Sequence, residues 1–188
     1  MKKTLLITTL LLSTIGAFAQ KNTSQSYVEQ FKDNAIAIMH ETGIPASIIL
    51  GIAIHESASG NSAIAQNLNN QFGFKGGGTT VYYKNNKKVK SAYKKYDSIL
   101  DSFEDFARVI THRQEIGKIS DQLTKYDYEK WVKGIQRSGY ASSKKWASQV
   151  LSIIRRNDLD DLDQTPAPIA PKTAEITPTI QSATPIIK

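Results

Sequence analysis

The apolar positions in the middle of the chain recur mostly with a helical period. A capping-box pattern at Ser26 and Glu29 opens a run of apolar residues on one helix face, which Gly43 ends. The next segment, from Pro45 to Ile54, is apolar on nearly every side, which predicts a helix buried at the centre of the fold. Three further segments with a helical period cover residues 98–112, 127–138 and 142–156.

A different pattern separates the buried helix from these later helices. Residues 60–70 are rich in turn-forming types, and two β-prone runs at 79–83 and 88–93 flank a polar turn, which predicts one small hairpin. We therefore expect an α+β fold, in which a mainly helical body carries a small β-hairpin lobe and a groove lies between the two.

The two ends of the chain do not resemble a packed domain. Residues 1–19 have two lysines, an apolar run and a small-residue site, the order of a cleavable signal peptide, and the run is too short to span a membrane. Residues 164–188 hold five of the six prolines and are predicted to form an extended tail. One domain over residues 20–163 is left, ending in an acidic run typical of a solvated helix end. We expect an exported protein, periplasmic or secreted, without a stable membrane anchor after cleavage.

The composition of the chain excludes several kinds of catalytic and metal site. The chain has no cysteine, which excludes disulfides, thiolate zinc sites and cysteine nucleophiles. A net charge of +7 on an exported protein favours an anionic cell wall rather than nucleic acid as the partner, although the excess charge could serve solubility alone. The histidines show no metal-ligand spacing, so we predict no metal site. We also predict a monomer without a cofactor.

Glu56 is the strongest candidate for chemistry. It follows the most apolar helix of the chain, where lost hydration favours the neutral form of a carboxyl group. Such a group can protonate a glycosidic oxygen as the sugar bond breaks. The alternative is a structural carboxylate bonded to backbone amides at the helix end. A zinc-protease motif is excluded, because the second histidine that it needs is replaced by Ser59.

Four segments have specific motifs, namely ILGIAIHES (49–57), NNQFGFKG (69–76), YDSILDSFEDF (96–106) and GYASSKKWA (139–147). Together they resemble the N-acetylglucosaminidases of glycoside hydrolase family 73, which are peptidoglycan hydrolases with a lysozyme-like fold, autolysins among them. The resemblance implies cleavage of the β-1,4 bond after N-acetylglucosamine in peptidoglycan glycan strands, with Glu56 as general acid. It also implies that Tyr140 lies in the catalytic groove, and that Asn70, Phe72 and Gly73 shape the entrance to the β-lobe.

The chain departs from this family in one respect. Many members carry a second carboxylate in the hairpin, but no Asp or Glu lies between Glu56 and Asp97 here. Either Asp97, Asp101 or another distant acid supplies it, or the 2-acetamido group of the substrate attacks the anomeric carbon while Glu56 acts alone. We favour substrate assistance, because N-acetylglucosamine brings that nucleophile with it.

The remaining aromatic candidates have two interpretations each. Tyr82 and Tyr83 are candidates for stacking on sugar rings, or else fill cross-strand pairs in the hairpin. Trp131 and Trp146 have the spacing of core residues, although the resemblance places Trp146 close to Tyr140 and hence among the substrate-binding candidates.

Two other functions remain open besides hydrolysis. A lytic transglycosylase shares the fold and a lone glutamic acid but closes the bond internally on muramic acid. A wall-binding module that has lost catalysis would explain the missing hairpin carboxylate.

Overall fold

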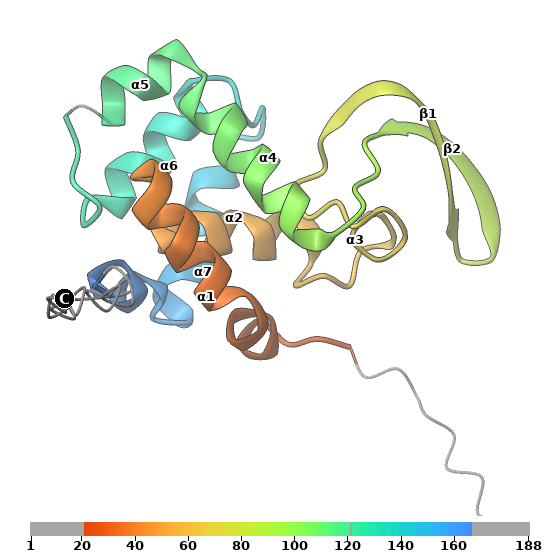
Figure 1. The fold of residues 1–188 in the computed structure, drawn as a ribbon, viewed down its shortest axis with the longest axis horizontal. Coiled ribbons are helices and arrows are strands. Elements are labelled where there is room, and N and C mark those ends of the chain that lie inside the picture. The colour runs from red at the N-terminus through yellow and green to blue at the C-terminus, as the bar shows by residue number, and fades with distance from the viewer. Residues whose placement is uncertain (1–20, 121, 167–188) are drawn as a thin grey trace, which may run out of the picture.

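The computed structural model describes residues 21–120 and 122–166, so the predicted signal peptide and most of the predicted tail lie outside the described residues. Helices pack into one body, and a two-stranded antiparallel hairpin projects from it on one side (Figure 1). None of the helices in the described ranges is long and apolar enough to cross a membrane. The elements are α1 (Ser24–Thr42), α2 (Ala46–Ser57), α3 (Ala63–Leu68), β1 (Lys75–Lys84), β2 (Lys87–Tyr93), α4 (Ile99–Thr111), α5 (Gln114–Ser120), α6 (Tyr128–Arg137), α7 (Trp146–Arg156) and the 3-10 helix η1 (Leu159–Gln164).

Helix α1 begins earlier than its sequence pattern predicts. Its capping box is formed by Thr23 and Ser26, not by Ser26 and Glu29. The Ser26 amide donates to Thr23 Oγ1 at 3.1 Å, and the Thr23 amide donates to Ser26 Oγ at 2.9 Å. A serine at the third helical position thus takes the place that Glu or Gln usually holds in this motif, and Glu29 instead pairs with Lys32 on the surface. The predicted end is confirmed at Gly43, whose φ of +76° is left-handed.

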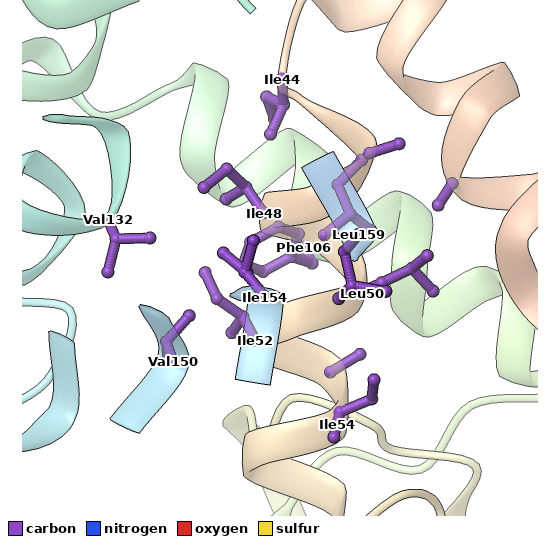
Figure 2. Close-up of a cluster of buried hydrophobic side chains, with 14 of the residues drawn as sticks. Ile44, Ile48, Leu50, Ile52, Ile54, Phe106, Val132, Val150, Ile154 and Leu159 are labelled. Atoms are coloured by element: carbon purple, nitrogen blue, oxygen red, sulfur yellow. The ribbon is translucent and has the colours of Figure 1, made fainter. Parts of the chain in front are cut away.

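Helix α2 forms the centre of the hydrophobic core, as its sequence predicts. Ile48, Leu50 and Ile52 have no exposed surface. Figure 2 shows their side chains among those of α4, α6, α7 and η1. Helix α7 packs tightly on α2 at Gly51, because a Cβ atom on this residue would lie 2.8 Å from Ile154 Cγ1. Glycine at this position therefore sets the distance between the two helices.

The first turn of α2 is capped from the far end of the domain. Its N-cap residue, Pro45, makes no side-chain cap hydrogen bond. Asp163 of η1 does so instead, since its Oδ1 accepts from the Ser47 amide at 2.9 Å and its Oδ2 from Ser47 Oγ at 2.6 Å. The interpretation of the acidic run as a solvated helix end is wrong for Asp163, which is only 1% exposed. Leu159, in the same segment, has no exposed surface. Leu159 packs into the core, and this contact draws the following turn back onto α2.

The hairpin has the register of a tight two-residue turn. Tyr82 lies opposite Val89, Tyr83 lies opposite Lys88, and Lys84 lies opposite Lys87. Positive φ angles of 49° and 60° at the two asparagines of the turn match the type that suits strand twist. Both strands are longer than predicted. Two short helices, α3 and α5, were not predicted, and α7 begins four residues later than its pattern suggested.

A polar cluster joins the base of the hairpin to α4. Asp105 accepts hydrogen bonds from Lys94 Nζ at 2.8 Å and Tyr96 Oη at 2.6 Å, and it also pairs with Arg108. Burial of the Asp105 carboxylate opposes its ionisation, but these three donors outweigh that cost and lower its pKa to about 2. The charged form therefore holds the segment after β2 against the body.

Candidate active site

A cavity of about 560 Å³ lies where the base of the hairpin meets the helical body, which is where the sequence predicts a groove. The ends of α2 and α7 and the loop after α6 form its helical side, and the segment from Phe72 to Lys75 together with Tyr93 forms its hairpin side. Its lining includes His55, Glu56, Phe72, Gly73, Phe74, Lys75, Tyr93, Arg113, Tyr140 and Trp146.

Glu56 enters this cavity from the last turn of α2. Its Oε1 accepts a hydrogen bond from the indole Nε1 of Trp146 at 2.8 Å, so its described partner is a side chain and not a backbone amide. Trp146 is the first residue of α7 and only 3% exposed, which keeps its indole in a fixed orientation. One carboxyl oxygen is thus oriented, and the other makes no hydrogen bond within the described residues.

The backbone beyond Glu56 leaves the helix by an unusual turn. Ala58 and Ser59 have φ angles of +53° and +56°, and Gly60 continues the left-handed run at +77°. Ser57 holds this turn, since its hydroxyl donates to the Ala53 carbonyl at 2.6 Å and accepts from the Gly60 amide at 2.7 Å. Left-handed backbone at two non-glycine residues is costly and persists only where the surroundings impose it. The end of α2, and Glu56 with it, is therefore firmly placed.

Tyr140 lies beside Glu56 in the lining. Its ring packs against Trp146, with centroids 5.3 Å apart, and meets Phe74 and Phe106 edge-on. Its hydroxyl is buried and has no hydrogen-bond partner within the described residues. Burial, and then the negative charge of Glu56, raise the pKa of Tyr140 well above its ordinary value. The hydroxyl therefore stays neutral, and its hydrogen has no acceptor among the described residues.

Sequence reasoning missed Arg113. Its Nη1 donates to the Ser138 carbonyl at 3.0 Å, and its guanidinium lies 5.9 Å from the centre of the Tyr140 ring. Arg113 occupies the loop between α4 and α5, outside every segment with a recognisable pattern, so no signal in the sequence points to it. Lys75 and His55 were also missed, although both belong to segments that the sequence singled out.

Asn70 lies outside the lining but bonds to the backbone of the hairpin base. It is 1% exposed, and its amide donates to the carbonyl oxygens of Phe74 at 2.9 Å and Lys94 at 2.8 Å. These bonds tie the two sides of the hairpin base together. Phe72 and Gly73, predicted beside it, are in the lining itself.

The other predicted site residues lie outside the cavity lining. Tyr83 is 58% exposed on the hairpin, and Tyr82 is buried at 7% in its cross-strand pair with Val89. Asp101 accepts from the amide and hydroxyl of Ser98 in the capping box of α4, and Asp97 directly precedes that cap. The roles of these residues with substrate stay predictions. Within the described part of the lining Glu56 is the only carboxylate, and no group of three potential metal ligands occurs among the described residues.

Comparison with known proteins identifies the family of this chain. Residues 32–159 match the Glucosaminidase family, described as mannosyl-glycoprotein endo-beta-N-acetylglucosaminidase. The chain is 26% identical to the exo-glucosaminidase LytG of Bacillus subtilis over 151 residues, which cover 74% of this chain and 54% of LytG. It is 27% identical to the peptidoglycan hydrolase FlgJ of Vibrio cholerae over 164 residues, which cover 80% of this chain and 48% of FlgJ. The chain thus spans about half the length of these two relatives.

A solved structure supports the fold. The catalytic domain of the autolysin Auto from Listeria monocytogenes superposes with a TM-score of 0.59 at 22% identity, over 78% of this chain and 91% of that domain. The predicted α+β fold of the lysozyme-like class is confirmed. Because the family match covers more than half of the chain and includes Glu56 and Tyr140, the protein belongs to the glucosaminidase family of glycoside hydrolases, family 73.

Proposed function

We propose that this protein is an exported peptidoglycan hydrolase that cleaves the β-1,4 bond after N-acetylglucosamine, with Glu56 as the general acid. One observation carries the proposal: Glu56 is the sole carboxylate in the described lining, is oriented by Trp146, and lies beside the unpartnered hydroxyl of Tyr140. The names of LytG and FlgJ support the substrate class. Export follows from the pattern of residues 1–19 and from the place of a wall substrate outside the cytoplasm.

The lining favours a reaction with a single protein carboxyl group. Glu56 gives its proton to the glycosidic oxygen as the bond to the anomeric carbon breaks. The acetamido oxygen of the same sugar forms a bond to that carbon, and a water molecule then displaces it and returns a proton to Glu56. Tyr140 would donate its hydroxyl proton in a hydrogen bond that orients the acetamido group for attack.

The test uses the full chain and purified wall sacculi. We expect the wild type to release fragments with reducing N-acetylglucosamine ends, and we expect Glu56→Gln to lower the rate by at least about a thousandfold while folding and sacculus binding persist. Asp97→Asn is the matched control. It removes a carboxylate outside the cavity and should leave most activity, whereas a loss of about a thousandfold, roughly 4 kcal/mol of barrier, would identify Asp97 as the second carboxylate.

Two outcomes would replace the proposal. Fragments ending in 1,6-anhydromuramic acid would identify a lytic transglycosylase, a reaction that also suits a lining with one carboxylate. Binding without release of sugar, equal in the wild type and in Glu56→Gln, would identify a wall-binding module.

A further inference from the structure

The charge of the cavity lining is unbalanced. Besides Glu56, the charged side chains in its described lining are two cations, Arg113 on the helical side and Lys75 on the hairpin side. Neither cation forms an ion pair with a described residue. By contrast Lys94, which follows β2 at the same base of the hairpin, is neutralised by Asp105 at 2.8 Å. Arg113 and Lys75 are therefore available for an acidic group that enters the cavity.

Aromatic rings hold both cations in place. The Arg113 guanidinium lies 5.9 Å from the centre of the Tyr140 ring, and Lys75 Nζ lies 5.6 Å from the centre of the Tyr93 ring. Both rings belong to the cavity lining. Stacking on a ring restricts a long side chain without neutralising its charge, so each cation can act on the contents of the cavity.

Arg113 also keeps donors free for a ligand. A guanidinium has five N–H donors in a planar fork, and the hydrogen bond that it makes with a described residue is the one from Nη1 to the Ser138 carbonyl. The other donors match the paired oxygens of a carboxylate. This pattern differs from that of Arg108, whose Nε and Nη2 are both engaged by Asp105.

The proposed substrate carries carboxylates on alternate sugars. N-acetylglucosamine is neutral, whereas N-acetylmuramic acid bears a lactyl group whose stem peptide ends in free carboxylates. We propose that Arg113 and Lys75 are positioning residues that bind carboxylates of the muramyl stem peptide, so that the cavity selects peptide-bearing glycan over a neutral polymer of N-acetylglucosamine. This inference rests on the proposed function and adds a determinant of its substrate specificity.

The experiment compares two forms of one substrate. Sacculi are used untreated, or after carbodiimide coupling to glycinamide, which neutralises the stem carboxylates and leaves the glycan intact. We expect neutralisation to lower kcat/KM of the wild type by about tenfold or more, the effect of losing one hydrogen bond to a charged group. Arg113→Gln and Lys75→Gln should show the lower rate on untreated sacculi and little further loss on neutralised sacculi.

Lys88→Gln is the matched control. Lys88 is exposed on the hairpin outside the cavity lining, so its replacement changes the net charge equally and should leave the preference for untreated sacculi intact. If Lys88→Gln abolishes the preference as fully as Arg113→Gln does, general attraction to the wall explains it and the inference is overturned.

Arg113 also bonds to the loop before Tyr140 and could therefore have a purely structural role. In that case Arg113→Gln would lower the rate on both forms of sacculi by the same factor, which would overturn the inference while the hydrolase proposal stands. If the wild type releases no sugar at all, the proposed function fails. Co-sedimentation of Glu56→Gln with the two forms of sacculi, with and without Arg113→Gln, then still decides whether this site binds stem carboxylates.

Discussion

Replacing Asp163 by Asn tests how the central helix is held. The carboxylate of Asp163 is buried at the first turn of α2, where two opposing effects act on it. Burial raises its pKa to about 6, while the hydrogen bonds from Ser47 counteract part of that rise. Burial is the larger effect, although a carboxylate at a helix N-terminus is usually stabilised in its charged form.

The titration of Asp163 makes the free energy of unfolding depend on pH. Between pH 4 and 6 the folded chain holds a proton on Asp163 that the unfolded chain, with an ordinary value of 3.8, has lost. The free energy of unfolding therefore falls as the pH rises through this window. The interval spans about two pH units at roughly 1.4 kcal/mol each, which gives a contribution of about 3 kcal/mol at most.

The measurement is urea unfolding of the full chain at pH 4 and pH 7.5, for the wild type and for Asp163→Asn. Asparagine keeps the size and the acceptor oxygen but does not titrate, and other titrating groups, Asp105 among them, cancel in the difference between the two proteins. We expect the wild type to gain up to about 3 kcal/mol relative to Asp163→Asn on going from pH 7.5 to pH 4. If the stability difference between the two proteins does not change with pH, or shifts in favour of the wild type as the pH rises from 4 to 7.5, burial does not outweigh the hydrogen bonds.

Two further substitutions test the core and the site. Gly51→Ala should lower the free energy of unfolding by about 1 to 2 kcal/mol in urea titrations, because the added Cβ meets Ile154 Cγ1 at 2.8 Å and the cost exceeds the gain in helix propensity; unchanged stability would mean that Ile154 can move aside. Trp146→Phe removes the donor to Glu56 and should lower kcat on sacculi by about 10- to 100-fold in a protein that remains folded; an unchanged kcat would show that Glu56 needs no orientation by the indole.

Local patterns predicted the parts of the fold that depend on neighbours in the sequence. The all-round apolar segment of α2 requires burial wherever the chain goes, and the hairpin follows from two β-prone runs about a polar turn. Glu56 could be recognised for the same reason, since it is the carboxyl group at the C-terminal end of this apolar helix. The short helix α3 has too few residues to show a period and was missed.

Contacts between distant segments could not be predicted in this way. Asp163 and Ser47 are 116 residues apart, and nothing in an acidic run shows which of its members will be buried. The indole of Trp146 reaches Glu56 across 90 residues. Arg113 is one of many cations in a basic chain, and only the fold places it in the cavity.

The cavity owes its shape to two separate sets of contacts. On the helical side, Glu56 is fixed by a helix that Asp163 caps at one end and that Trp146 contacts at the other. On the hairpin side, Asn70 and Asp105 tie the base of the hairpin to itself and to α4. The hydrogen bonds that place Glu56 therefore lie within the helical body, whereas the distance from Lys75 to Glu56 depends on both sets. We accordingly expect changes in the hairpin to alter which glycan is bound before they alter the proposed proton transfer from Glu56.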